Sequence, residues 1–145
     1  MAVSLQPVAG FSPEVAANLS NKQVQKRLSP AARNAFFKIA TAWKIRDEEA
    51  KQLLGGISNG AFYQLKGGEL KAPLDQDRLV RVSLLVGIFK ALNTLYSQKL
   101  ADAWILLPNT NPMFAGDTPL AYMVEGGQPA MMRVRQLLDA RRVAG

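Results

Sequence analysis

The chain contains no cysteine and no histidine among its 145 residues. Without cysteine it can form no disulfide and offers no thiol nucleophile, and without histidine it lacks the usual neutral-pH base and common zinc ligand. These absences exclude thiol catalysis, imidazole catalysis and the common zinc sites. A chain without cysteine also fits a reducing compartment. We therefore expect a cytoplasmic protein with no metal and no cofactor.

Long apolar runs are also missing. Nowhere do eighteen apolar residues follow one another, and the N-terminus shows no basic segment leading into an apolar one. A membrane-spanning helix needs about 20 mostly apolar residues, and a secretory signal needs that basic and apolar order. We therefore expect no membrane partner. The 48% hydrophobic content is typical of a globular protein with one core or two small domains.

Acidic residues are scarce: 11 Asp and Glu stand against 18 Lys and Arg, for a net charge of +7. Residues 22–99 hold 14 basic and 6 acidic residues, whereas residues 100–145 hold four of each. Basic charge concentrated in one region is expected of a phosphate-binding surface, which gains affinity by releasing counterions. A basic face that only keeps the protein in solution is the alternative.

The most informative motif lies in that basic region, at residues 47–66. A short helix that carries the apolar residues Ala50, Leu53 and Leu54 reaches a break at Gly55-Gly56, and a second short helix follows at once. Two helices joined by so tight a glycine turn are typical of a helix-turn-helix, which places its second helix in the DNA major groove. The sequence therefore predicts operator DNA as a partner.

The second helix of this motif supplies the candidate DNA contacts. Phe62 and Leu65 have the spacing of core residues, so the other polar positions are expected to point outward. Asparagine and glutamine can hydrogen-bond the adenine edge, tyrosine and lysine suit phosphates, and the helix N-terminus itself attracts a phosphate. The predicted DNA-binding residues are Ser58, Asn59, Tyr63, Gln64 and Lys66.

Two longer helices are expected around the motif. Ser29-Pro30 has the form of a helix start, so we predict a helix over 30–44 with Phe36 and Trp43 in the core. Asp75 caps a predicted helix over 76–96, which is apolar nearly all round from Val82 onward. A helix without a polar face is wrapped by neighbours. That surface is either buried inside the monomer or partly the seam of a homodimer, as in regulators that bind two half-sites.

The fold class predicted for the whole chain is all-α. Residues 1–28 are expected to be a weakly ordered lead with a short helix near residues 13–19, and residues 29–97 a helix-turn-helix domain with a long central helix. Residues 98–145 are expected to be a small helical domain. Its helices are predicted from Ser97 to Ile105, from Pro119 to Glu125, and from Pro129 onward, with a break at Gly126-Gly127.

Three stretches of the sequence resemble a known family: RLVRVSLLVGIFKALNTLY, ADAWILLPNTNPMFAGDTPLAYMVEGG and MRVRQLLDARR. In order and spacing they are similar to the antitoxins of the Xre/MbcA/ParS class, from about residue 30 to residue 142. The most specific elements are the stretch 78–85, Trp104, Pro108-Asn109, Phe114, Gly116, Pro119-Leu120 and Gly126-Gly127. Antitoxins of this class bind a RES-domain toxin through their C-terminal domain.

The resemblance implies a non-enzymatic antitoxin. Its partner would be a cytoplasmic RES toxin that degrades NAD or transfers a group from it. The C-terminal domain would dock over the NAD site of that toxin. Many such antitoxins also repress their own operon. Arginines of the last helix could pair with acidic toxin groups, and its apolar residues could enter the pocket. The candidate toxin contacts are Met131, Arg133, Arg135, Leu138, Arg141 and Arg142.

Two other functions remain open at this stage. A stand-alone transcription regulator would use its neutral C-terminal domain to dimerise or to sense a ligand. An enzyme is disfavoured, because the sequence shows no nucleophile with a base, no metal-ligand cluster and no glycine-rich phosphate loop after a strand.

Overall fold

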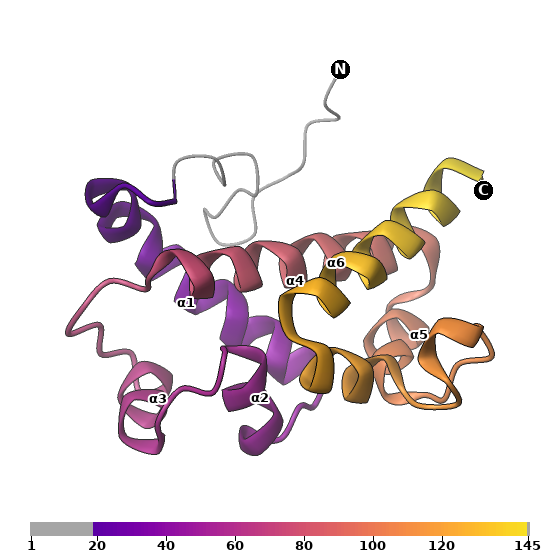
Figure 1. The fold of residues 1–145 in the computed structure, drawn as a ribbon, viewed down its shortest axis with the longest axis horizontal. Coiled ribbons are helices and arrows are strands. Elements are labelled where there is room, and N and C mark those ends of the chain that lie inside the picture. Colours follow the sequence, from indigo (N-terminus) through magenta and orange to yellow (C-terminus); the bar gives the residue numbers. More distant parts are fainter. Residues whose placement is uncertain (1–18, 145) are drawn as a thin grey trace.

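The structure is a computed structural model that describes residues 19–144. Within that range the chain forms α-helices and short 3-10 helices and contains no β-strand (Figure 1). In chain order these are α1 (Lys22–Ala42), α2 (Asp47–Leu53), α3 (Asn59–Lys66), α4 (Gln76–Leu95), α5 (Gln98–Ala103), η2 (Trp104–Leu106), η3 (Pro112–Phe114) and α6 (Pro119–Ala144). The predicted all-α fold is confirmed.

Helix α4 lies at the centre of the fold. The Asp75 side chain caps its first turn by accepting a hydrogen bond from the Arg78 amide at 2.9 Å, as the sequence predicted. Every residue from Val82 to Ile88 is buried, because α1 packs on one side of the helix and α6 on the other. The apolar run is therefore buried inside the monomer, as in the first of the two alternatives that the sequence left open.

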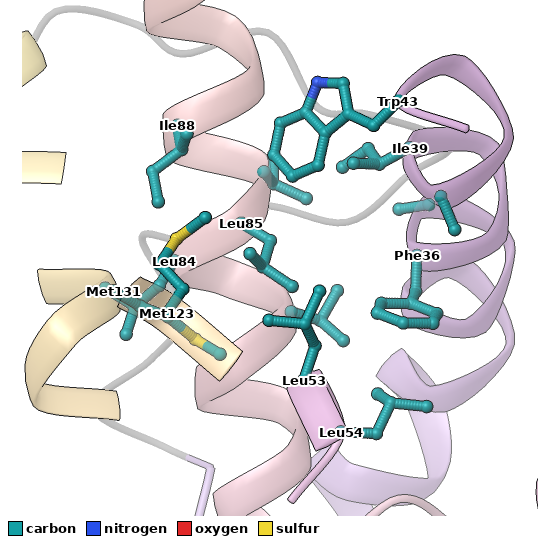
Figure 2. Close-up of a cluster of buried hydrophobic side chains, with 14 of the residues drawn as sticks. Phe36, Ile39, Trp43, Leu53, Leu54, Leu84, Leu85, Ile88, Met123 and Met131 are labelled. Atoms are coloured by element: carbon teal, nitrogen blue, oxygen red, sulfur yellow. The ribbon is translucent and has the colours of Figure 1, made fainter. Parts of the chain in front are cut away.

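One continuous core includes residues from Leu19 to Leu138. Figure 2 shows side chains of α1, α2 and α6 converging on Leu84, Leu85 and Ile88 of α4. The predicted core residues Phe36 and Trp43 are 2% and 0% exposed. The same buried cluster includes residues from both sides of position 97, where we placed a domain boundary.

Helix α1 differs from the prediction at its start. It begins at Lys22, where the Asn21 side chain accepts hydrogen bonds from two backbone amides, and Pro30 lies inside it. The predicted start at Pro30 was wrong because Ser29 is not a cap. The Ser29 hydroxyl donates to the Gln25 carbonyl at 2.6 Å and accepts from the amide of Leu74 at 2.8 Å.

Burial explains why the helix continues through the proline. The turns that precede Pro30 bury Gln25 and Leu28, and the Gln25 amide group donates to the Leu19 carbonyl at 2.8 Å. These contacts offset the cost of a proline within a helix, which is about 3 kcal/mol relative to alanine. Residues 22–28 therefore belong to α1 rather than to a lead segment. The short helix predicted near residues 13–19 falls almost entirely outside the described residues.

The C-terminal helices follow the sequence signals closely. Ser97 caps α5, which leads into η2, and the Trp104 ring packs edge-on against Phe114 with centroids 6.1 Å apart. Helix α6 is interrupted at Gly127, whose φ of 67° and ψ of −148° are not helical. The predicted break at Gly126-Gly127 is thus confirmed, and the two halves of α6 meet there at a kink.

The position of Pro30 generates a prediction about stability. Replacing Pro30 by alanine is expected to raise the free energy of unfolding by about 1–3 kcal/mol in chemical denaturation, because alanine restores a backbone donor and removes a steric clash. Pro30 is exposed, so the change removes little buried surface.

Pro129 is the matched control for this change. It is exposed and stands two residues after the kink at Gly127, at the start of the second half of α6. Proline is favourable at the first position of a helix. Pro129→Ala should therefore leave stability unchanged or lower it. A Pro30→Ala variant that behaves in the same way would contradict the helix start at Lys22.

Candidate nucleic-acid interface

Helices α2 and α3 form a pair joined by residues 54–58. Helix α2 carries three acidic residues in its first turn, where they favour the positive end of the helix dipole. Helix α3 begins behind Ser58, whose side chain accepts from the Ala61 amide at 3.3 Å. The two helices have the bounds that the sequence predicted, and Phe62 and Leu65 anchor α3 in the core.

The turn between them requires glycine at Gly55 and Gly56. Their φ angles are 91° and 79°, in the region that residues with a side chain rarely adopt. Gly55 also lies so close to α4 that a Cβ atom there would be 2.9 Å from a carboxylate oxygen of Asp77. The amides of both glycines bond back to carbonyls of α2 at 2.9 Å, which ends that helix sharply.

Lys51 joins the two helices from the α2 side. Although it is charged, the residue is only 6% exposed. Its Nζ donates to Glu48 at 2.7 Å and to the Asn59 side-chain oxygen at 2.5 Å, and it lies 5.8 Å from the centre of the Tyr63 ring. A buried ammonium group needs such partners, because it has lost most of its water. Lys51 therefore holds the first turn of α3 against α2.

Asp47 makes a second link between the same helices. Its carboxylate accepts from Lys66 Nζ at 2.8 Å and from the Tyr63 hydroxyl at 3.2 Å. The hydrogen bond from Lys66, followed by that from Tyr63, holds the pKa of Asp47 below its ordinary value. The side chains of both predicted DNA contacts are thus fixed by one carboxylate of α2.

Arg33 of α1 holds the other end of α3. Its guanidinium donates to the carbonyl oxygens of Leu65 at 2.7 Å and Lys66 at 2.5 Å, and it lies over the ring of Phe37. The last carbonyls of a helix have no partner within the helix, and a cation at this end also favours the helix dipole. Arg33 thereby fixes the C-terminal end of α3 relative to α1.

The predicted DNA-binding residues fall into two groups in the structure. All five are exposed, Tyr63 at 50%, and they differ in whether the side chain already has a hydrogen-bond partner. The Gln64 side chain makes no hydrogen bond to any of residues 19–144. By contrast, the other four side chains are engaged. Asn59 accepts from Lys51, Lys66 and the Tyr63 hydroxyl donate to Asp47, and Ser58 caps α3. Gln64 is therefore the candidate whose polar groups are most available to a ligand.

A surface groove runs beside α3, on the side away from Lys51 and Asp47. Its lining includes Ser58, Ala61 and Gln64, the segment 69–75, and Arg78 at the start of α4. Arg78 donates to Asp75 at 3.0 Å. The groove thus places Gln64 and a cation of α4 along the same hollow in the surface.

The six predicted toxin contacts do not form a single surface. Met131 and Leu138 are 0% exposed and belong to the core against α4, so they are not presented to a partner in this conformation. Their side chains lie on the inner face of α6 because that face covers the apolar run of α4. Arg133 is exposed and donates to the Tyr122 hydroxyl at 3.4 Å.

The other three arginines of this set are partly buried against neighbours. Arg135 lies across α4 at Gly87, where an added Cβ would come within 2.6 Å of its guanidinium carbon, and it pairs with Asp139 at 3.5 Å. Arg142 pairs with the same Asp139 at 3.6 Å. Arg141 donates to the Tyr96 hydroxyl at 3.2 Å. Of the six, Arg133 is thus the only one in the exposed class.

A cluster on α4 connects the α2–α3 pair with α6. Arg81 pairs with Asp77 at 3.1 Å and donates to the Leu53 carbonyl at the end of α2. The side chain of Gln128, beside the kink of α6, donates to the same Asp77 at 2.5 Å. Helix α2 also packs directly against α6. The α2–α3 pair and α6 are therefore both held to the start of α4 through Asp77 and Arg81.

Comparison with known proteins gives a relative of matching length. The chain is 38% identical over 116 residues to the uncharacterized protein y4oB of Sinorhizobium fredii strain NBRC 101917 / NGR234. The match covers 78% of this chain and 85% of the relative. The chain belongs to the y4oB family. No family model and no solved structure matches it.

Neither a metal-binding cluster of acidic side chains nor a membrane-spanning helix is found among the described residues of this member of the y4oB family. Residues 19–144 hold no group of three or more Asp and Glu side chains placed to bind a metal ion. None of the helices in that range has both the length and the apolar character needed to cross a membrane.

The sequence did not identify the residues that position α3. Lys51, Asp47 and Arg33 are separated from their α3 partners by between 8 and 33 positions along the chain. In the sequence each is one charged residue among many. The proximity of Lys51 and Asn59 follows from the angle between α2 and α3, which no local pattern specifies.

The environment of Asp47 generates a prediction about protonation. We expect NMR titration to give Asp47 a pKa below its ordinary 3.8, and Lys66→Met to raise that pKa more than Tyr63→Phe does. Because the pKa is lower in the folded than in the unfolded chain, the stabilising contribution is complete above about pH 4 and is lost as the pH falls through the folded value.

Lys99→Met serves as the control, because Lys99 is an exposed cation on the distant α5. It should leave the Asp47 titration unchanged. An Asp47 pKa that is ordinary in the natural protein, or that Lys66→Met does not move, would contradict the link between the two helices.

Proposed function

We propose that this protein binds duplex DNA through the α2–α3 pair and serves as the antitoxin of a RES-type toxin. The observation that carries the DNA-binding part is the fixed position of α3. Lys51, Asp47 and Arg33 hold it from two sides, and Gln64 stays free on its exposed face. A recognition helix must be held rigidly if its side chains are to select a base sequence.

The composition of the exposed face of α3 supports direct contact with bases. Gly60, Tyr63 and Gln64 are exposed there, and an added Cβ at Gly60 would meet nothing within 4 Å. The absence of a side chain at Gly60 lets the helix approach a base edge closely. Gln64 can then donate to and accept from an adenine, while the ring of Tyr63, whose hydroxyl donates to Asp47, can contact a thymine methyl group.

The hydrogen bonds from Lys51 to Asn59 and from Lys66 to Asp47 change the proposed roles of Asn59 and Lys66 in DNA binding. The side-chain oxygen of Asn59 already accepts a hydrogen bond, so its NH₂ group is the part available to DNA. It therefore suits an acceptor, such as a guanine O6 or a phosphate oxygen, better than bidentate pairing with adenine. Lys66 contributes less charge to a phosphate, because Asp47 partly neutralises it.

The antitoxin part of the proposal rests on the resemblance of residues 30–142 to the Xre/MbcA/ParS class. The exposed face of α6 is where we place the toxin contact. Met132 is 44% exposed, the adjacent Arg133 is exposed, and Val143 near the end of the helix is 89% exposed. An apolar residue beside a cation suits a pocket with an apolar wall and an acidic rim. Met131 and Leu138 then support this face from within the core.

The DNA-binding role predicts a sequence-specific defect. Duplexes selected by the natural protein from a random library should bind Gln64→Ala more weakly by about 1–3 kcal/mol, roughly fivefold to 150-fold, because a base contact is lost. Binding of a scrambled duplex should change little. Gln136→Ala, an equivalent truncation of an exposed residue on α6, should bind both duplexes as the natural protein does. Equal weakening on both duplexes would show that Gln64 reads no base.

The antitoxin role predicts a separate defect. The product of the adjacent gene should stop growth and deplete cellular NAD when expressed alone, and co-expression of this protein should reverse both effects. The double change Met132→Asp and Arg133→Glu should abolish the rescue, because it places negative charge against an acidic rim. Both residues lie outside the core, so the thermal unfolding midpoint should stay near that of the natural protein.

Gln64→Ala is the matched control for the rescue, because it alters α3 and leaves α6 untouched. It should still protect the cells. If the adjacent product is not toxic, or if the natural protein gives no protection, the stand-alone regulator becomes the better proposal. Full protection by a folded α6 variant would instead place the toxin contact elsewhere on the chain.

A further inference from the structure

The strongest basic surface of the described chain lies on α1 rather than on α3. The 21 residues of α1 include no aspartate or glutamate. Four of its five cations are in the exposed class and the fifth, Arg33, is bound to carbonyls of α3. The exposed four are Lys22, Lys26, Arg27 and Lys38.

These four cations are distributed around the exposed half of the helix, with Lys22 and Lys38 toward its two edges. The buried positions of α1, such as Leu28, Ala35 and Ile39, define the opposite side at helical spacing. Between the cations, the outward side carries Gln23, Pro30, Asn34 and Thr41, all exposed and uncharged. From Lys22 to Lys38 the surface is about 24 Å long, at 1.5 Å per residue. We refer to it as the α1 basic face.

The cations of the α1 basic face have no acidic partner among residues 19–144. Elsewhere in that range seven cations form ion pairs, which are Arg46, Lys51, Lys66, Arg78, Arg81, Arg135 and Arg142. An ion-paired cation offers a partner less net charge. The α1 basic face is therefore where unneutralised charge is concentrated.

The placement of these charges also opposes the stability of the isolated helix. Lys22 stands in the first turn of α1, at the positive end of the helix dipole, where an acidic residue would be favourable. Lys22 and Lys26 are four residues apart, and like charges at that spacing repel. Nothing in α1 compensates for this. An external polyanion would turn the same charges into favourable contacts.

We infer that the α1 basic face binds the phosphate backbone of duplex DNA. A face about 24 Å long is shorter than one duplex turn of roughly 34 Å, so a single helix can meet several successive phosphates. Arg33 joins α1 to the end of α3, which places this face on the element that carries the proposed recognition helix. The inference rests on the proposed DNA binding and assigns most of its affinity to α1.

The test is the salt dependence of binding to duplex DNA, measured by fluorescence anisotropy. Each phosphate contact contributes about 0.9 to the slope of log affinity against log salt concentration. The fourfold variant Lys22→Gln, Lys26→Gln, Arg27→Gln and Lys38→Gln should therefore lower the magnitude of that slope by about 3 to 4. Its unfolding midpoint should equal or exceed that of the natural protein, since repulsion within α1 is removed.

A charge-preserving variant at the same positions is the matched control. Lys22→Arg, Lys26→Arg, Arg27→Lys and Lys38→Arg should keep the slope of the natural protein, and Lys99→Gln should lower it by much less than one. A slope that the fourfold glutamine variant leaves unchanged overturns the inference, even where sequence preference persists through Gln64.

The outcomes separate this inference from the proposed function. Salt-dependent binding that falls in the fourfold glutamine variant, but shows no preference between selected and scrambled duplexes, supports the α1 basic face and contradicts reading by α3. Absence of duplex binding by the natural protein contradicts both. Binding to phosphatidylglycerol vesicles without binding to DNA would assign the α1 basic face to an anionic membrane and overturn the inference.

Discussion

The fold depends on the burial of α4. From Val82 to Ile88 this helix has no polar face, so the chain must cover it on two sides. Helices α1 and α6 provide that cover, and each therefore has one face committed to the core. The outward faces of α1 and α6 are what remain for partners. The candidate surfaces are thus set by how α4 is covered.

The features that the sequence predicted are those specified locally. Asp75 caps α4, Gly55-Gly56 ends α2, and Gly127 kinks α6, and each effect involves only a few neighbouring residues. The start of α1 was missed because it depends on residues distant in sequence. Ser29 bonds to the Leu74 amide, 45 positions away, and the turns before Pro30 are held by burial. Tertiary contacts there override the signal that Ser29-Pro30 gives in isolation.

For the candidate site, too, the sequence predicted what is specified locally, which is the side of a helix that each residue faces. Helical spacing correctly placed Phe62 and Leu65 inside and Tyr63 and Gln64 outside, because the period of α3 alone decides which side a residue faces. The same reasoning applied to α6 assigned residues of both its inner and its outer face to the toxin contact. Met131 and Leu138 proved to be core, while Arg133 is exposed. Without the position of α4, an apolar residue on α6 could be assigned to either a core or a partner.

Pairing explains why net charge alone could not locate an interface. The basic excess spans residues 22–99, yet much of it near α3 is neutralised, since Lys66 meets Asp47 and Lys51 meets Glu48. Those pairs serve to orient α3. The repulsion that remains unrelieved is on α1, where Lys22 and Lys26 face the same side with no acidic neighbour on the helix. The acidic residues near α3 thus serve to hold that helix in position, whereas α1 has no acidic residue to offset its cations. The surface that is held most firmly and the surface that carries the most unpaired charge are therefore on different helices.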